Sequence, residues 1–177
     1  MIQEDKFEIL IFAETEVLKG LIFISTPEGR LLDELNGRSQ LAPENRDKFI
    51  MINNVDIWHM DGTEEKAPVV HINKENIEMS GTTTINTGRG IGASAGPKHY
   101  PFTDKTPIKV RIEMAGYTII GNMYRVMHQQ VEHVLKEKVA FLPLTDVEII
   151  STKFDKRWTL SFLAVNKWKV LSLHEQI

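Results

Sequence analysis

The residues of this chain that could do chemistry lie mainly in one glycine-rich stretch. Residues 92–96 read Gly-Ala-Ser-Ala-Gly, which matches the G-x-S-x-G motif that holds the nucleophilic serine of α/β-hydrolases. That motif needs a strand before the serine and a helix after it, whereas no strong strand precedes Gly92 and Pro97 interrupts the segment after the serine. A flexible connection is therefore a better interpretation of this stretch than a hydrolase site.

The same stretch has the glycine content of a phosphate-binding loop. The spacing of Gly88, Gly90 and Gly92 fits neither G-x-G-x-x-G nor G-x-x-x-x-G-K-[ST], and no strand-helix-strand pattern encloses them. We therefore expect no nucleotide site here and no cofactor.

The histidines and carboxylates do not have the spacing of a metal or acid-base site. None of the six histidines is followed by another at the i, i+4 spacing that places two ligands on one helix face, and His128 and His133 are five positions apart. Glu148 alternates with Val147 and Ile149, as residues on the solvent face of a strand do. We expect no catalytic residue and no metal site, and the lack of cysteine excludes thiolate ligands and disulfides.

Six residues are candidates for contacts with a partner. Four of them add positive charge and aromatic rings to the glycine-rich stretch, a composition that can contact RNA or an acidic protein surface. The other two are tryptophans near the C-terminus, a residue type enriched at interface hot spots, although we expect one of the two to pack in the core. The six candidates are Arg89, Lys98, Tyr100, Phe102, Trp158 and Trp168.

An internal repeat predicts the elements that position these residues. Residues 6–24 align without a gap with residues 107–125, and residues 49–57 show the same apolar pattern as residues 141–149. The dipeptide Asn73-Lys74 recurs as Asn166-Lys167, and we expect a tight turn there before a last short strand. Matched blocks in the same order indicate a duplication, with about eight extra residues in the first copy, at positions 40–47.

Each copy is predicted to run strand, strand, short helix, strand, strand and a last short strand. Gly20 and Gly121 fall at the same place inside a strand, which predicts a bulge or sharp bend. Thr26-Pro27-Glu28 has the form of a helix start and Asn36-Gly37 that of a helix end. The second helix is expected between residues 128 and 138.

The predicted fold class is mostly β (α+β), with two tandem curled-sheet or barrel modules at residues 1–79 and 107–177. Residues 80–106 hold five of the chain's 11 glycines, a composition that buries too little apolar surface to order itself, and we expect them to form a linker. A module of this size buries only about 60% of its unfolded surface. We therefore expect the two modules to pack on each other or on a partner.

The order of three blocks in each copy resembles a bacterial family of small β-rich domains of unknown function. The blocks are residues 30–36, 49–57 and 72–77 in the first copy and residues 131–135, 141–149 and 165–167 in the second. The second copy departs from the pattern because it lacks the Arg-Leu-Leu-Asp opening and the Asn-Gly helix end. This resemblance implies no activity. A weaker similarity is to Sm-like barrels, whose bent five-stranded sheets form rings through edge-strand pairing.

These patterns favour a non-enzymatic assembly protein. A net charge of −3 gives no bulk attraction to nucleic acid or to an anionic membrane. No apolar run approaches the roughly 18 residues of a membrane span and residues 1–7 do not form a signal peptide, so we expect a cytoplasmic protein without membrane insertion. Two modules on a tether predict a bivalent connector, a homo-oligomer or accessory subunit that docks on repeated subunits of itself or of a larger complex. An Sm-like RNA-binding module is the alternative.

Overall fold

The computed structural model describes residues 5–24, 31–37, 48–83, 105–126 and 128–176. The N-terminal half, residues 5–82, contains β1 (Asp5–Ala13), β2 (Glu16–Ile24), α1 (Leu31–Asn36), β3 (Phe49–His59), β4 (Glu64–Asn73), the short 3-10 helix η1 (Lys74–Asn76) and β5 (Ile77–Thr82). The C-terminal half, residues 105–175, contains β6 (Lys105–Met114), β7 (Tyr117–Val126), α2 (Val131–Lys136), β8 (Phe141–Ser151), β9 (Lys156–Asn166), the 3-10 helix η2 (Lys167–Lys169) and β10 (Val170–Glu175). The molecule is thus mostly β, and each half has the predicted order of elements.

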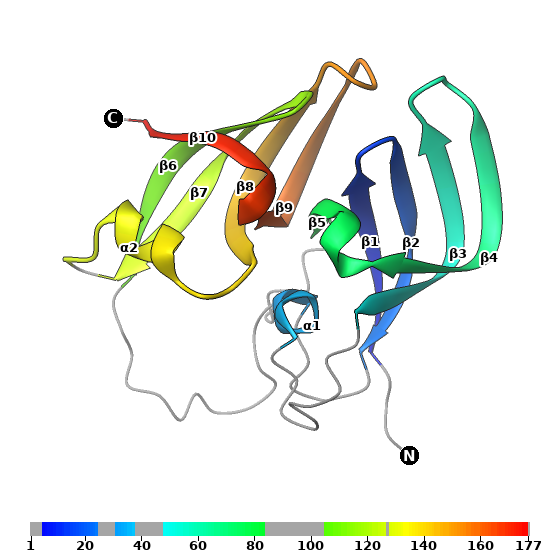
Figure 1. The fold of residues 1–177 in the computed structure, drawn as a ribbon, viewed down its shortest axis with the longest axis horizontal. Helices are drawn as coiled ribbons and strands as arrows, with labels where there is room; N and C mark the ends of the chain where they lie inside the picture. The colour runs from blue at the N-terminus through cyan, green and yellow to red at the C-terminus, as the bar shows by residue number, and fades with distance from the viewer. Residues whose placement is uncertain (1–4, 25–30, 38–47, 84–104, 127, 177) are drawn as a thin grey trace.

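All of these strands belong to one 10-stranded antiparallel sheet with the order β10-β6-β7-β8-β9-β5-β1-β2-β3-β4. Each half contributes its strands in the same relative order, and the halves join where β9 pairs with β5, near the centre of Figure 1. Strands β4 and β10 lie at the two ends of the sheet, and no described strand pairs with their outer edges. The sheet is therefore open, and neither half closes into a barrel.

The matched glycines mark bends in the sheet, as predicted. The pairing shifts register between Lys19 and Leu21 where β2 meets β3, and the equivalent shift surrounds Gly121 where β7 meets β8. A Cβ atom on Gly20 would lie 2.6 Å from Ile52 Cγ2, so only glycine lets the neighbouring strand come this close. Both glycines therefore lie at the β-bulges that the sequence predicts.

The repeated Asn-Lys dipeptide has the same two roles in both halves. The side-chain oxygens of Asn73 and Asn166 accept hydrogen bonds from backbone N–H groups of η1 and η2, at 2.9 Å and 3.1 Å. Lys74 Nζ then donates to a carbonyl oxygen of α1 at 2.8 Å, and Lys167 Nζ to one of α2 at 3.1 Å. Each dipeptide therefore makes the predicted tight turn and also ties the α-helix to the sheet.

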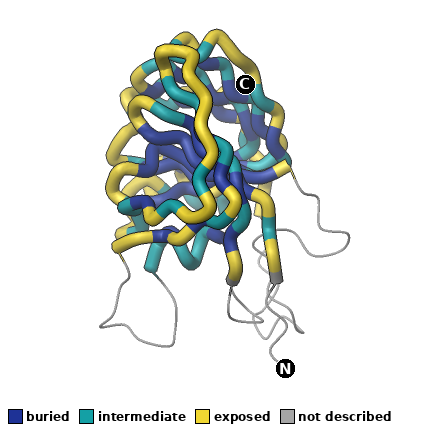
Figure 2. The backbone as a smooth tube through the Cα atoms, turned by 90° about the vertical axis from the view of Figure 1, so that its right-hand side faces the viewer, coloured by how far each residue is buried: buried dark blue, intermediate teal, exposed yellow. Residues whose placement is uncertain are grey.

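Buried apolar side chains form two clusters, and each cluster takes residues from both halves. The cluster of the C-terminal half includes Phe12 and Met79, and the cluster of the N-terminal half includes Phe141 and Ala164. The buried backbone in Figure 2 lies behind the exposed strands of the near side. Packing of the halves on each other is one of the two outcomes expected for modules of this size, and it makes them one continuous structure.

The structure describes only the two ends of the predicted linker at residues 80–106. Ser80 to Thr82 belong to β5 and Lys105 begins β6, so strands extend into both ends of the predicted linker. The small polar residues resemble a loop in sequence, yet Ser80 is buried and its hydroxyl donates to the Leu10 carbonyl oxygen at 3.1 Å. Residues 84–104, the predicted insertion at 40–47 and the predicted helix start at 26–28 lie outside the described residues.

Candidate functional site: the joined and the open edges of the sheet

The joined edge is a short antiparallel ladder between β5 and β9. Asn166 adds a buried hydrogen bond across it, from Nδ2 to the Ile77 carbonyl oxygen at 3.0 Å. A Cβ atom on Gly81 would lie 2.5 Å from the Phe162 carbonyl oxygen, so a glycine is needed for this close approach. The opposed residues are Met79 and Val165, Ser80 and Ala164, Gly81 and Leu163, and Thr82 and Phe162.

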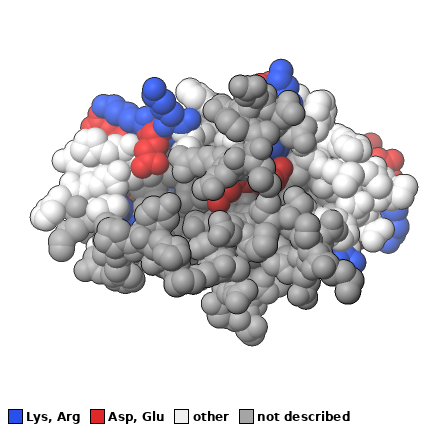
Figure 3. Space-filling view, turned by 90° about the horizontal axis from the view of Figure 1, so that it is seen from below, with Lys and Arg blue, Asp and Glu red and all other residues white. Residues whose placement is uncertain are grey.

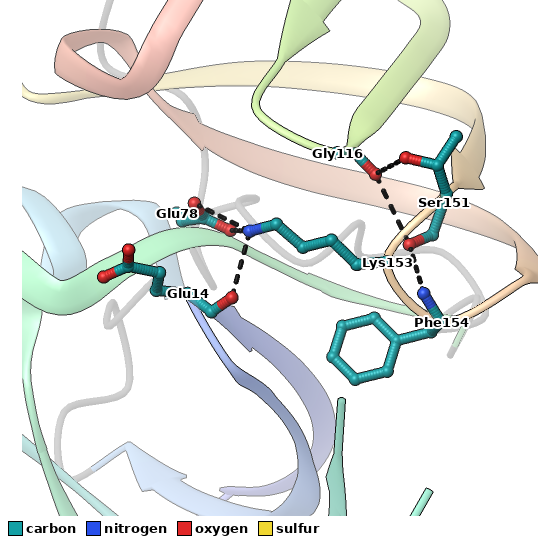
Figure 4. A network of polar contacts seen from close by, with 7 residues as sticks. Glu14, Glu78, Gly116, Ser151, Lys153 and Phe154 are labelled. Carbon is teal, nitrogen blue, oxygen red and sulfur yellow. Dashed lines mark hydrogen bonds and ion pairs between the residues drawn. The ribbon is translucent and has the colours of Figure 1, made fainter. Parts of the chain in front are cut away.

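A lysine in the turn between β8 and β9 reaches across the joined edge (Figure 4). Lys153 Nζ lies 3.3 Å from Glu78 Oε2 and donates to the Glu14 carbonyl oxygen at 3.0 Å. The side chains of Lys153 and Glu78 are only 14% and 8% exposed, so each charge depends on the other. Gly116 makes room for the lysine, because a Cβ there would lie 2.4 Å from Lys153 Cγ. The pair locks the C-terminal half onto the N-terminal half.

The Tyr117 ring packs beneath the Lys153 side chain of this ion pair. It lies 5.0 Å from Lys153 Nζ and meets the Phe12 ring edge to face at 5.8 Å. Burial raises the pKa of Tyr117 well above its usual range, the negative charge of Glu78 raises it further, and the nearby Ser151 hydroxyl acts in the opposite direction. The phenol therefore stays protonated at physiological pH, where it serves as a packing group.

The end of α1 also crosses between the halves. The side-chain amide of Asn36 accepts from the Phe141 backbone N–H at 2.8 Å and donates to the Phe141 carbonyl oxygen at 3.3 Å. Gly37 follows with a positive φ of 65°, which confirms the predicted helix end. Asn36 thus extends the edge of β8 much as a strand residue would.

Apolar side chains on or beside the open edge strands are exposed, whereas their counterparts at the joined edge are buried or half-buried. Phe49 begins β3 and is 50% exposed, whereas its counterpart Phe141, at the start of β8, is 2% exposed. Val69 on β4 is 43% exposed. Leu171 on β10 is 72% exposed, whereas the residue at the equivalent position of β5, Glu78, is buried. Figure 2 looks onto the β4 side of the sheet and shows exposed and half-buried backbone in front. These edges therefore carry exposed apolar side chains, as protein interfaces do, and no described strand pairs with them.

The two tryptophans predicted to contact a partner occupy different environments. Trp168 lies in η2 and is 83% exposed, close in sequence to the open strand β10. Trp158 on β9 is half-buried, and its ring meets the Phe12 ring at 5.0 Å. It lines a pocket of about 120 Å³ together with Val17, Trp58, Phe154 and Lys156. The other four candidates, Arg89, Lys98, Tyr100 and Phe102, lie outside the described residues.

Many charged side chains of the described residues lie beside a charge of opposite sign. Figure 3 shows lysine or arginine next to aspartate or glutamate on one face of the molecule. The surface therefore carries mixed charge where these pairs lie. The pairs include Lys19 and Glu8, Lys66 and Asp56, Arg111 and Glu113, Lys136 and Glu132, and Arg157 and Glu148.

Within the described ranges, no three histidine, aspartate or glutamate side chains form a group that could hold a metal ion. None of the helices that the structure describes has the length and apolar character needed to cross a membrane. Comparison of the chain with protein-family models, curated proteins and solved structures gives no match.

Proposed function

We propose that this chain is a non-enzymatic structural subunit whose two open sheet edges dock on repeated subunits, of itself or of a larger complex, to build a higher-order assembly. In this proposal the two halves are tandem modules of one duplicated design. The supporting observation is the joined edge: β5 and β9 already unite two similar half-sheets, while β4 and β10 remain unpaired at the ends. The chain could then bind two partners at once, one at each open edge of the same continuous sheet.

An unpaired edge strand is a ready template for another strand. Its backbone N–H and C=O groups are unsatisfied by protein on one side, and many proteins bind partners by adding a strand there. Both ends of the sheet also carry exposed apolar side chains, Phe49 and Val69 at one end and Leu171 at the other. Strand addition would satisfy the backbone groups and cover these side chains together.

A second candidate, single-stranded RNA binding, draws support from the pocket of Trp58 and Trp158. Lys156 Nζ lies 5.5 Å from the centre of the Trp58 ring, and aromatic rings beside a lysine can stack a base and contact its phosphate. RNA retention that weakens with salt would favour this function. We prefer the assembly function because mixed charges, rather than a basic stripe, surround the described strands.

The test of the assembly function is a charge placed beside the open β4 edge, at Phe49 on the neighbouring strand β3, opposite Asn73 of β4. Phe49→Lys puts a charged side chain where the partner strand would pack, and the expected result is loss of the large species that wild-type protein forms in an extract of its native host. Size-exclusion chromatography of the tagged chain measures this. Phe23→Lys is the matched control, because Phe23 is also an exposed phenylalanine, at 40%, but lies on β2, which β3 separates from the open strand β4.

The two variants separate the edge from general effects of the substitution. Equal assembly by the Phe49→Lys and Phe23→Lys proteins would show that the β4 edge is not the docking surface. Wild-type protein that elutes as a single chain in the native extract would contradict the proposed function altogether. Circular dichroism of each purified variant checks that the sheet is intact.

A further inference from the structure

We propose that the partner at the open edges is a second copy of this chain, joined head to tail: β4 of one copy pairs with β10 of the next in the register of the β9–β5 ladder. This inference rests on the proposed function and names its partner. The molecule already contains one example of this contact, because β9 occupies the place in its half that β4 occupies in the other, and β10 the place of β5.

The backbones of the equivalent strands have matching irregularities. Asn54 on β3 and Asp146 on β8 both have a φ of 51°, at the register shift against the second strand of each half. The fourth strand of each half then pairs with β3 or β8 in one unbroken register. At the other end, one residue is skipped at Glu78 where β5 pairs with β1, and at Leu171 where β10 pairs with β6. Each open edge therefore has the shape of one side of the joined edge.

This equivalence fixes the register of the outer ladder. Asn73 and Asn166 align the fourth strands, and the skipped residues Glu78 and Leu171 align the last strands. Pro68, which has no N–H to donate, lies just beyond the last of the paired positions and does not interrupt them. The expected opposed residues, β4 first and β10 of the next copy second, are Ile72 and Ser172, His71 and Leu173, Val70 and His174, and Val69 and Glu175.

An asparagine at the open edge is ready to complete the outer ladder. Asn73 holds its oxygen on the Glu75 N–H at 2.9 Å, as Asn166 holds its own on the Trp168 N–H. At the joined edge the other side-chain atom of Asn166, Nδ2, donates across the ladder to Ile77. The equivalent acceptor for Asn73 is the Val170 carbonyl oxygen of the next copy.

Apolar packing supports the same placement. Phe141 and Phe162 of the C-terminal half pack against the apolar cluster of the N-terminal half beside the joined edge. Their counterparts at the open end are Phe49 and Val69, both exposed in the single chain. Head-to-tail pairing would place these two side chains against the C-terminal half of the next copy, where apolar side chains could cover them.

The outer contact lacks two features of the joined edge, which makes it weaker. His174 stands where β5 has Gly81, so the strands cannot approach as closely. Leu171 stands where β5 has Glu78, and the turn after β3 carries Asp61 and Gly62 with no lysine, so the buried ion pair has no counterpart. We therefore expect a reversible, concentration-dependent assembly. Contacts of this head-to-tail kind close into a ring or continue as a filament.

The test uses the absence of cysteine from the chain. A tagged Val69→Cys chain and an untagged Glu175→Cys chain are mixed and treated with a short thiol-to-thiol crosslinker. The two positions are directly opposed in the expected register, where Cβ atoms lie about 4.5–5.5 Å apart. The expected product on a denaturing gel is the mixed dimer, and each chain alone should give none.

The other outcomes overturn the inference in distinguishable ways. Crosslinks within the Val69→Cys chain alone, or within the Glu175→Cys chain alone, would show that like edges meet face to face. No crosslink in the mixture or in either chain alone would show that a second copy is not the partner. If the native-extract species still depends on Phe49 in that case, the proposed function stands with a different partner; if no such species exists, both fail.

Discussion

At the scale of single residues, the contact between Lys153 and Glu78 shows how the two halves are held together. A buried ion pair contributes little relative to apolar packing, but removal of one partner leaves the other charge buried without compensation. Lys153→Met should therefore lower the free energy of unfolding by about 3 kcal/mol, measured by chemical denaturation at neutral pH. The double variant Lys153→Met/Glu78→Leu should recover most of this loss.

An exposed ion pair provides the control for this prediction. Arg157 and Glu148 lie 3.0 Å apart with side chains 70% and 42% exposed, so Arg157→Met should change the unfolding free energy by less than about 0.5 kcal/mol. If Lys153→Met lowered the unfolding free energy as little as Arg157→Met, solvent would already screen the Lys153 charge. The two halves would then be held together by β5–β9 pairing and apolar contacts alone.

At the scale of elements, the repeat allows one substitution to be compared at two equivalent places. A Cβ on Gly20 would meet Ile52 Cγ2 at 2.6 Å and the Asn53 carbonyl oxygen at 2.8 Å, whereas a Cβ on Gly121 would meet Val147 Cγ2 at 3.0 Å. Gly20→Ala should cost about 2 kcal/mol and Gly121→Ala about 1 kcal/mol or less, as judged by thermal unfolding monitored by circular dichroism. Equal losses would mean that strand propensity, not close approach, fixes these glycines.

The elements could be predicted from the sequence because their signals are local. Alternation of apolar residues, the glycines at the two bends and the Asn36-Gly37 helix end each act within a few residues, and the structure confirms all three. The contacts across the joined edge are not local. Lys153 meets a carboxylate 75 residues away, and nothing in the pattern around either residue distinguishes it from a solvent-exposed charge.

The local sequence does not predict the end of β5, for the same reason. Ser80 to Thr82 are small and polar, as linker residues are. They become strand because Ser80 and Gly81 pair with both β1 and β9, and Thr82 pairs with β9. Asn36 is a further example: as a helix end it is predictable, but its hydrogen bonds to Phe141 depend on the arrangement of the two halves. Tertiary pairing, rather than propensity, decides these positions.

At the scale of the whole molecule, the joined and open edges differ in how closely strands can approach. At the joined edge a side chain in place of Gly81 would collide with the Phe162 carbonyl oxygen. His174 places a side chain at the equivalent position of β10, so the outer ladder must sit further apart than the inner one. Together with the missing ion pair, this difference should make the contact between copies weaker than the contact within a copy.

Removal of that side chain should therefore strengthen assembly. His174→Gly is expected to lower the protein concentration at half-assembly by about five- to tenfold, measured by light scattering across a dilution series. The same change should slightly lower the thermal stability of the single chain, because glycine within a strand costs about 0.5–1 kcal/mol. Glu175→Gly is the matched control: it has the same intrinsic cost, but its counterpart Thr82 is not a glycine. Tighter assembly with His174→Gly alone can come only from a strand that approaches position 174, whereas parallel weakening by both variants would place the partner strand elsewhere.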